Sequence, residues 1–376
     1  MGCIASDYSA TKFFYFAGLV VTAVLTWVLR DYATSALGHV GPLRDCLSIT
    51  DEALKATCVG KGLVLRISFG NFIFFAAHVL ALLCVSKEDD LRRFFHTGLL
   101  PLQGIAWLGI IIACFVMPNN VFSVYGQIAR MLSGFFLIIQ IILLLGFIYA
   151  INEYLIDKDH ISHKIALVGA TISMYACGLV IIGFMFHYYA PAPSCSLNIF
   201  FITWTLILGI AYSIFSVTPY RSKAAGLLTS ATVFIYTAVV LFNALSSEPV
   251  GNACVLTAGN VSSGLQIFFF FLGLAIMLVS VMTSSQEAAS FRLTAGSTSD
   301  GELPYRPDFF HLIFMLASAY IAMVFTTWNL EGVSGHQSGD KGWASVWVKI
   351  VSQWVCVILY SWSMAAPAIL KDREFV

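Results

Sequence analysis

Ten stretches of about 20 consecutive, predominantly apolar residues constrain the fold of this chain more than any other feature. Each is long enough to cross the hydrocarbon core of a bilayer, which is about 30 Å thick. None shows the alternating pattern of a transmembrane β-strand, and backbone groups in lipid have no water to bond, so each stretch is predicted to form a helix. The ten predicted spans are residues 13–29, 63–85, 98–117, 129–151, 165–189, 198–217, 226–245, 264–283, 309–327 and 345–366.

The sparse charge of the chain excludes an ordinary soluble protein. Charged residues make up 11% of the 376 residues and hydrophobic residues 59%, whereas about 25% of the residues of soluble domains are charged. Twenty basic residues balance twenty acidic ones, so no net charge recruits nucleic acid. We therefore predict an all-α polytopic membrane protein with about ten transmembrane helices and no nucleic-acid partner.

The distribution of basic residues predicts which side of the membrane each loop occupies. With the N-terminus placed in the cytosol, twelve basic residues fall on the cytosolic side, namely Lys12, Lys87, Arg92, Arg93, Lys158, Lys164, Arg221, Lys223, Arg292, Arg306, Lys371 and Arg373. Six fall on the other side, namely Arg30, Arg44, Lys55, Lys61, Arg130 and Lys341. Cytosolic loops carry an excess of Lys and Arg, so this imbalance predicts that both termini are cytosolic.

Four of the nine cysteines fall in loops that the charge distribution places outside the cytosol: Cys46, Cys58, Cys195 and Cys254. Disulfides persist in such an oxidising compartment, and an even number of cysteines permits two bridges. Three pairings are open; the local pair Cys46–Cys58 would leave Cys195–Cys254, and free thiols are the alternative to any bridge. The cysteines inside predicted spans are read as small packing residues: Cys84, Cys114, Cys177 and Cys356.

Two short motifs mark candidate modification sites. The N-terminal sequence from Met1 to Ser6 matches the myristoylation pattern, with Gly2 as the acceptor and Cys3 as a palmitoylation candidate. A multispan protein gains little anchoring from an acyl chain, so an unmodified N-terminus is the alternative. Asn260 begins a glycosylation sequon on the predicted outer side, although its position a few residues before a span disfavours glycosylation.

Arg66 and Lys349 are the two basic residues placed well inside predicted spans, each about one turn from the end. A charge at the centre of a span costs about 2.5–3.5 kcal/mol on insertion scales, so such residues point to function by default. Both would enter from the outer face, and both are candidates for lining a polar lipid path that holds phosphate. In the alternative, the side chains extend to the outer headgroups and their removal costs little stability. Uncharged polar residues in the spans, such as His78, Gln103, Gln140 and Gln353, are predicted to join helices.

Catalytic and metal-binding motifs are not found. The chain has no Gly-rich phosphate loop, His-Glu-x-x-His motif or Gly-x-Ser-x-Gly elbow. The nearest cluster runs from Asp157 to His163 in a predicted cytosolic loop, where no spacing fixes a coordination geometry, so a solvated loop is the better reading. We predict no catalytic residue, no metal and no cofactor, and hence no enzyme.

Motifs spread from about residue 58 to the C-terminus form a specific set. They are Cys58–Gly60, Val64–Phe69, Ser222–Leu228, Asn243–Pro249, Phe309–Phe314, Tyr320–Met323, Thr327–Asn329, Trp347–Ile350 and Ala366–Pro367 with Asp372–Phe375. Together these motifs resemble the serine incorporator (Serinc) family, and the C-terminal ending is similar to that of plant-type members. Gly146 stands where the family usually has an acidic residue before a Phe, and Ile151 where it has a Trp, so no role of that acidic side chain is carried over.

The resemblance implies a single transmembrane domain over residues 1–376, built as two helical bundles joined by a long tilted helix. The fourth apolar run continues as far as Asp157, which fits such a long helix. The implied function is lipid handling that supports serine incorporation into phosphatidylserine and sphingolipids, and the alternative is ATP-independent phospholipid scrambling. The implied partners are membrane phospholipids, serine and lipid-biosynthetic enzymes. Homo-oligomers are compatible with this reading, and an endomembrane or the plasma membrane is the expected location.

Overall fold

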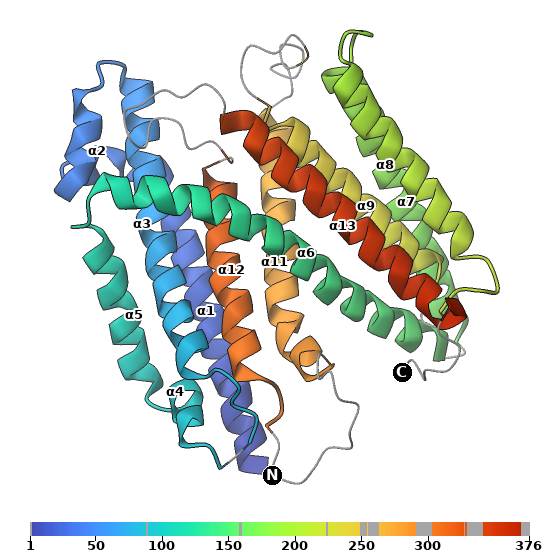
Figure 1. Ribbon diagram of the computed structural model, residues 1–376, viewed down its shortest axis with the longest axis horizontal. Helices are drawn as coiled ribbons and strands as arrows, with labels where there is room; N and C mark the ends of the chain where they lie inside the picture. The colour runs from blue at the N-terminus through green and yellow to red at the C-terminus, as the bar shows by residue number, and fades with distance from the viewer. Residues whose placement is uncertain are drawn as a thin grey trace. The chain divides into compact units, whose positions relative to one another are not determined.

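The computed structural model describes residues 2–87, 89–157, 160–222, 225–248, 254, 263–290, 303–326, 328 and 341–369. These residues form helices joined by turns and short loops, and no β-strand occurs among them (Figure 1). The all-α fold class is therefore confirmed. The chain divides into two compact units, unit 1 (Met1–Phe136 with Met277–Lys341) and unit 2 (Leu137–Ile276 with Gly342–Val376).

Unit 1 is built around one central helix, α3. Its elements are α1 (Gly2–Tyr32), α2 (Thr34–Leu37), the 3-10 helix η1 (Gly41–Ser48), α3 (Glu52–Ala81), the 3-10 helix η2 (Leu91–Arg93), α4 (Phe94–Thr97), α5 (Leu100–Cys114) and α12 (Pro307–Phe325). The first part of α6 (Asn119–Asp157) and the last part of α11 (Ser263–Ser290) belong to it as well. Helix α3 packs against α12, α5 and α1, which lie beside it in Figure 1.

Polar side chains join the helices of unit 1 where their apolar faces meet. Asn71 of α3 accepts a hydrogen bond from the Trp107 indole of α5 at 2.8 Å and donates one to the Thr22 hydroxyl of α1 at 3.0 Å. Ser68 donates to the Ser318 carbonyl of α12 at 2.8 Å. These bonds satisfy buried polar groups that lipid could not satisfy, and they fix the register of four helices.

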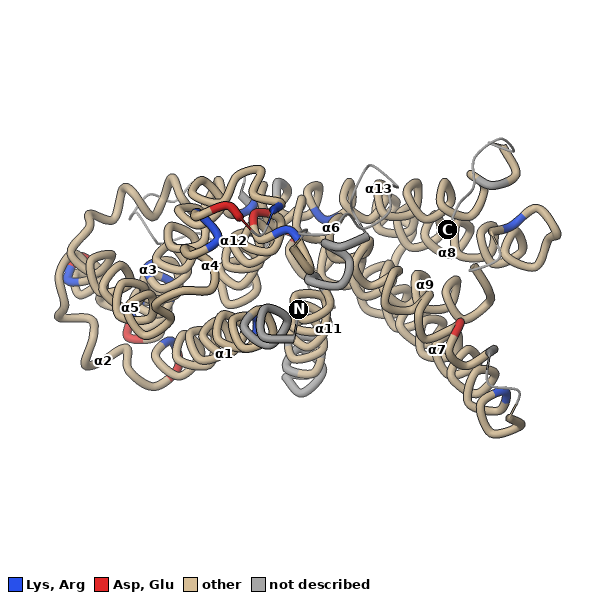
Figure 2. Tube along the Cα trace, turned by 90° about the horizontal axis from the view of Figure 1, so that it is seen from below, with Lys and Arg blue, Asp and Glu red and all other residues tan. Residues whose placement is uncertain are grey.

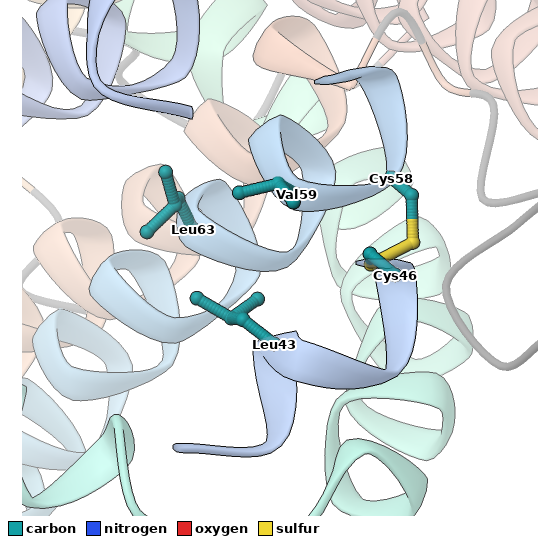
Figure 3. Close-up of a cluster of buried hydrophobic side chains, with 5 residues drawn as sticks. All are labelled: Leu43, Cys46, Cys58, Val59 and Leu63. Atoms are coloured by element: carbon teal, nitrogen blue, oxygen red, sulfur yellow. A yellow bond between two sulfur atoms is a disulfide. The ribbon is translucent and has the colours of Figure 1, made fainter. Parts of the chain in front are cut away.

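A small buried cluster anchors η1 to the beginning of α3. Leu43 and Cys46 of η1 pack against Cys58, Val59 and Leu63 of α3, with Cys46 and Cys58 joined as a disulfide (Figure 3). Leu29, Leu37, Ile49 and Phe115 cover this cluster. The segment between the first two predicted spans is therefore a folded part of unit 1.

Unit 2 contains α7 (Ile161–Tyr189), α8 (Ser196–Phe215), α9 (Leu227–Leu245), most of α13 (Lys341–Ile369) and the remaining parts of α6 and α11. Helix α9 packs against α7 and α8, and the Phe234 ring lies between glycines of these two helices. A Cβ atom at Gly178 or at Gly209 would come within 2.5 Å of that ring. Both glycines are therefore required for the close approach of α7 and α8 to α9.

Eight described helices are long and apolar enough to cross a membrane. The pair Leu91–Thr97 and Leu100–Cys114 is bent by 70° and counts as a ninth span if the two parts cross together, while Phe271–Thr283 of α11 is a shorter apolar helix. Each of the ten predicted runs thus overlaps a helix, and several helices extend beyond the apolar run that predicted them. Helix α3 begins at Glu52 instead of residue 63, because the Asp51 carboxylate caps the amides of Ala53 and Leu54 at 2.8 and 3.2 Å.

Helix α6 is the long helix that the sequence predicts. Its 39 residues give a length of about 58 Å, roughly twice the thickness of the hydrocarbon core. Residues up to Phe136 belong to unit 1 and residues from Leu137 belong to unit 2, so the two units share this helix.

Candidate functional site

Arg66 lies inside α3 and is fully buried, with 0% of its surface exposed. Its guanidinium donates hydrogen bonds to the Gly62 carbonyl at 3.2 Å and to Asn119 Oδ1 at 2.7 Å. The guanidinium carbon also lies 4.4 Å from the centroid of the Phe122 ring. Asn119 in turn donates to the Asp45 carboxylate at 2.8 Å. Arg66 therefore links α3 to the start of α6 and, through Asn119, to η1.

Lys349 lies inside α13 and is 2% exposed. Its ammonium donates to the Asn243 carbonyl at 2.8 Å and to the Ser247 hydroxyl at 2.7 Å, at the C-terminal end of α9. A cation near the last carbonyls of a helix satisfies acceptors that have no partner within that helix. Lys349 thus caps the C-terminal end of α9 within unit 2.

The two lipid-path candidates lie in different units of the chain. Arg66 belongs to unit 1 and Lys349 to unit 2, and each is enclosed by polar partners of its own unit. Their part in a lipid path stays a prediction.

Lys349 is one member of a row of polar side chains on α13, which we call the α13 polar row: Lys349, Gln353 and Tyr360. Gln353 donates to the Thr205 hydroxyl at 2.9 Å and to the Thr237 carbonyl at 3.0 Å. The Tyr360 hydroxyl lies 2.7 Å from the Ser230 hydroxyl. The row extends about 17 Å along the helix, which is more than half the thickness of the hydrocarbon core. Unit 2 therefore contains polar groups through much of its apolar interior.

The other candidate residues from the sequence are the four cysteines of the predicted bridges and the possible modification sites. Cys46 bonds to Cys58 and Cys195 to Cys254, each with a Cα–Cα distance of 5.8 Å, within the usual range of about 4.4–6.8 Å. Gly2 is the first residue of α1 and Cys3 follows it. Asn260 lies outside the described residues. In the described part of the chain, no group of three or more His, Cys, Asp or Glu residues is placed to hold a metal ion.

A cavity of about 450 Å³ lies where α1 and α12 end and α3 begins in unit 1, and we call it the α1–α3 cavity. Two cations, Arg30 and Lys61, and one carboxylate, Asp31, line it. The other lining residues are Thr34, Ala56, Thr57, Gly60, Phe325 and Thr326. The cavity thus combines both signs of charge with hydroxyl groups and an aromatic ring.

Arg30 is held in a fixed orientation at the wall of this cavity. Its Nε and Nη2 donate to the two carboxylate oxygens of Asp31 at 2.6 and 3.0 Å, and its Nη1 donates to the Phe325 carbonyl at 2.9 Å. A Cβ atom at Gly60 would lie 3.2 Å from the Arg30 side chain, so α1 and α3 approach closely here. The bidentate ion pair and the close helix packing together keep a charged pair in place at the cavity.

Comparison with known proteins gives a consistent family. The family model described as serine incorporator (Serinc) matches residues 2–305 and 292–373. Serine incorporator 3 of Bos taurus is 28% identical over 83% of this chain and 79% of its own length. A membrane protein of Schizosaccharomyces pombe is 31% identical over 95% of this chain and 88% of its own, and a probable serine incorporator of Nematostella vectensis is 27% identical over 96% and 89%.

The chain belongs to the serine incorporator family. The resemblance inferred from the sequence motifs is therefore confirmed, although the match begins at residue 2 and not near residue 58. The matched ranges include α1, α3 and α12, so every wall of the α1–α3 cavity lies within the Serinc region.

Sequence reasoning counted Arg30 and Lys61 only as charges of an outer loop and missed the cavity. One sequence signal for a charged site at the end of α1 was available: Arg30 and Asp31 follow directly after the apolar run that ends at Leu29. The contribution of α12 to the cavity could not be predicted from the sequence, since the Phe325 carbonyl that accepts a hydrogen bond from Arg30 is 295 residues away in the chain. Only the folded Serinc domain brings these residues to one place.

Proposed function

We propose that this serine incorporator family member handles membrane lipids without catalysing their chemistry, and that it supports the incorporation of serine into phosphatidylserine and sphingolipids. The observation that carries the proposal is the charge pattern of the α1–α3 cavity, in which two cations stand beside a carboxylate. An ammonium group next to a phosphate or carboxylate complements this pattern. Free serine and a serine-bearing headgroup share that chemistry, and the family description refers to serine incorporation.

The size and position of the cavity support a lipid headgroup as its occupant. Its volume of about 450 Å³ falls within the usual range of ligand sites, about 300–1,000 Å³. Arg30 lies in the last turn of α1, and Phe325 is the last residue of α12. Residues at the ends of spans are expected at the level of the headgroups. A headgroup can therefore enter from the bilayer, while free serine would enter from water.

The test is binding by the purified full-length protein in detergent, with short-chain phosphatidylserine and free serine as separate ligands. Lys61→Gln and Arg30→Gln are each expected to weaken binding of the lipid by about tenfold or more, because each removes a charge-assisted hydrogen bond. Lys55→Gln is the matched control, since Lys55 is on the same helix and pairs with Glu52 outside the cavity.

The two ligands separate the alternatives. Weakened binding of the lipid alone identifies a headgroup site, and weakened binding of serine alone identifies a site that presents the free amino acid. If the two cavity variants bind both ligands as the Lys55→Gln control does, the cavity is not the site and the proposal is wrong.

The α13 polar row favours a second candidate, ATP-independent phospholipid scrambling. Polar side chains that continue through an apolar bundle lower the cost of moving a headgroup across it. Gln353 is the central member, and its buried Oε1 has no hydrogen-bond partner among the described residues. A passing headgroup could donate a hydrogen bond to this oxygen.

Leaflet exchange of labelled phospholipid in liposomes without nucleotide tests this candidate. Gln353→Leu is expected to slow exchange several-fold, whereas Ser173→Leu, which removes an exposed hydroxyl from α7 in the same unit, is expected to leave it unchanged. Equal rates for the two variants and the unmodified protein would remove the α13 polar row from any scrambling path.

A further inference from the structure

Three histidines from three different helices meet at one end of unit 1. His78 belongs to α3, His96 to α4 and His311 to α12. His96 and His311 are fully buried, and the ring centroid of His311 lies 4.6 Å from that of His78 and 5.1 Å from that of His96. We call these residues the histidine cluster. The proposed lipid-handling function does not use it.

Two of these imidazoles are part of a short chain of hydrogen bonds. His96 Nε2 lies 2.9 Å from the Tyr305 hydroxyl, and His96 Nδ1 lies 3.0 Å from His311 Nε2. Burial raises the pKa of the Tyr305 hydroxyl, so this group keeps its proton. A nitrogen–nitrogen contact at 3.0 Å needs one N–H donor and one lone pair. If both nitrogens carry a proton, the bond that joins α4 to α12 is lost.

The far side of His311 has no hydrogen-bond partner. Its Nδ1 atom is buried and unbonded among the residues that the structure describes. Aromatic side chains surround this imidazole, with the ring of Tyr15 at 4.7 Å, that of Phe310 at 5.4 Å and that of Phe75 at 5.9 Å between centroids. A proton added at Nδ1 would create a buried charge without an acceptor, which is costly.

No described carboxylate is in contact with the cluster to offset such a charge. The titratable and charged groups facing it or adjoining it are, by element, Tyr8, Lys12 and Tyr15 on α1, His78 on α3, His96 on α4, Tyr305 and Arg306 before α12, and Asp308 and His311 on α12. The Asp308 carboxylate is already paired, because it accepts hydrogen bonds from Arg306 at 2.6 Å and from the Cys84 amide at 3.2 Å. Gln103 is the polar group that α5 contributes, and it does not titrate.

Two short segments cover the histidine cluster, and we call them the α4 cover: α4 itself and residues 303–306. Helix α4 has four residues and is followed by Leu99 in the left-handed region at a φ of 50°. Hydrogen bonds hold both segments: Tyr15 donates to the His96 carbonyl at 3.1 Å, Gln103 donates to the Phe95 and Gly98 carbonyls at 3.0 and 2.6 Å, and the Leu303 amide donates to the Ser86 carbonyl at 3.2 Å. Figure 2 shows charged residues beside α4 and α12, where the ion pairs Asp90–Arg92 and Arg306–Asp308 adjoin the cover.

We propose that the histidine cluster is a proton-binding site, and that proton uptake by His96 and His311 opens the α4 cover. In the closed state, both imidazoles are enclosed without a counter-charge, and their mutual bond requires that one nitrogen remain unprotonated. In the open state, water reaches both rings and each can accept a proton. Acidification therefore favours the open state, and the end of unit 1 formed by α1, α3 and α12 becomes accessible.

The test is hydrogen–deuterium exchange of the full-length protein in nanodiscs at pH 7.5 and pH 5.5, with rates corrected for intrinsic exchange. Peptides that cover residues 91–98 and 303–312 are expected to lose about a hundredfold in protection at pH 5.5. Each proton taken up contributes about tenfold per pH unit below the ordinary imidazole pKa of about 6.5, and two buried imidazoles take part. Peptides of α9, which has no histidine, are expected to keep their protection.

His311→Gln separates a proton site from simple packing. Glutamine can place its amide where Nε2 of His311 contacts Nδ1 of His96, but it cannot be protonated. The loss of protection in this variant is expected to be about tenfold smaller, since one proton is removed from the linkage. His39→Gln is the matched control, because His39 is exposed in the same unit, and it is expected to behave as the unmodified protein does.

Two results would overturn the proposal. One is equal protection of the two peptides at pH 7.5 and pH 5.5 in the unmodified protein. The other is a pH-dependent loss in His311→Gln as large as that in His39→Gln. If His311→Gln does not fold at pH 7.5, His96→Gln takes its place, and the pH profile of the unmodified protein still decides the first point.

Discussion

Arg66 is held within α3 by partners from separate segments of unit 1. The Gly62 carbonyl lies one turn away on the same helix, whereas Asn119 and Phe122 come from the start of α6. Asn119 extends the network to Asp45 of η1. A cation is costly in an apolar bundle unless such partners satisfy it, so these contacts are what permit Arg66 at this depth.

Replacing Arg66 by Leu is expected to destabilise the protein by about 1–3 kcal/mol, because Asn119 loses its donor and the contact with Phe122 disappears. The sequence-based expectation that removal of the charge costs little stability assumed a side chain extended to the headgroups, and the same measurement decides between the two expectations. The measurement is the midpoint of thermal unfolding in detergent, with Lys55→Leu as the control on the same helix. Equal midpoints for the two variants would show that the network contributes nothing to stability.

Arg66 and Lys349 could be identified from the sequence, because a charged residue inside an apolar run can be recognised without knowing the fold. Their partners could not be identified in the same way. Asn119 lies 53 positions from Arg66, and Asn243 lies 106 positions from Lys349. For the same reason His96 and His311, 215 positions apart, did not stand out as a pair. Polar contacts between spans depend on helix packing, which the pattern of apolar residues does not fix.

At the scale of whole helices, unit 2 depends on close packing around one aromatic ring. Phe234 of α9 fills the space left by the missing side chains of Gly178 on α7 and Gly209 on α8. Small residues at helix interfaces allow such approach in membranes, where packing and not the hydrophobic effect drives association. The other face of α7 carries Gly183, which has no atom within 4 Å of a Cβ position.

Gly178→Ala is therefore expected to destabilise the protein, and Gly183→Ala is not. The first places a Cβ atom 2.5 Å from the Phe234 ring and should cost about 1–3 kcal/mol through overpacking. The second meets open space and should be neutral or stabilising by up to about 1 kcal/mol, since Ala favours the helix. Thermal unfolding of the two variants in the same detergent provides the comparison. A Gly178→Ala variant as stable as Gly183→Ala would contradict this packing.

Helix boundaries were the part of the fold that apolar runs described least well. The first turns of α3 carry Glu52, Lys55 and Lys61, so a rule based on apolar residues begins the span only after Lys61. The helix starts earlier because of local hydrogen bonding by Asp51, a signal that the sequence contained. The 70° bend between α4 and α5 lies at Leu99, which adopts a backbone conformation that favours glycine, and Gly98 and Pro101 beside it are the sequence signals for a break there.

At the scale of the whole molecule, ten apolar runs were enough to predict an all-α membrane protein because a helix satisfies its own backbone in lipid. The runs could not predict which helices form unit 1 and which form unit 2. Residues 277–341 return to unit 1 after the chain has built most of unit 2, so the grouping does not follow sequence order.

The cysteines offer a check of membrane orientation that does not use charge. The disulfide Cys46–Cys58 in unit 1 and the disulfide Cys195–Cys254 in unit 2 belong to loops predicted to face an oxidising compartment. Cys84 is an exposed free thiol just beyond the C-terminal end of α3, whereas Cys58 lies near the N-terminal end of that helix. If α3 crosses the membrane, Cys84 and the Cys46–Cys58 disulfide face opposite compartments.

A membrane-impermeant maleimide is expected to label Cys84 in sealed microsomes, whose outer face is cytosolic. Cys46, freed by the substitution Cys58→Ser, should be labelled only after detergent opens the vesicles. Cys3 and Cys177 are replaced by Ser in both samples, because Cys177 is a second exposed thiol and Cys3 lies in the N-terminal segment predicted to be cytosolic. Cys84 is also replaced by Ser in the sample that tests Cys46. Labelling of Cys46 in sealed vesicles together with protection of Cys84 would reverse the predicted orientation.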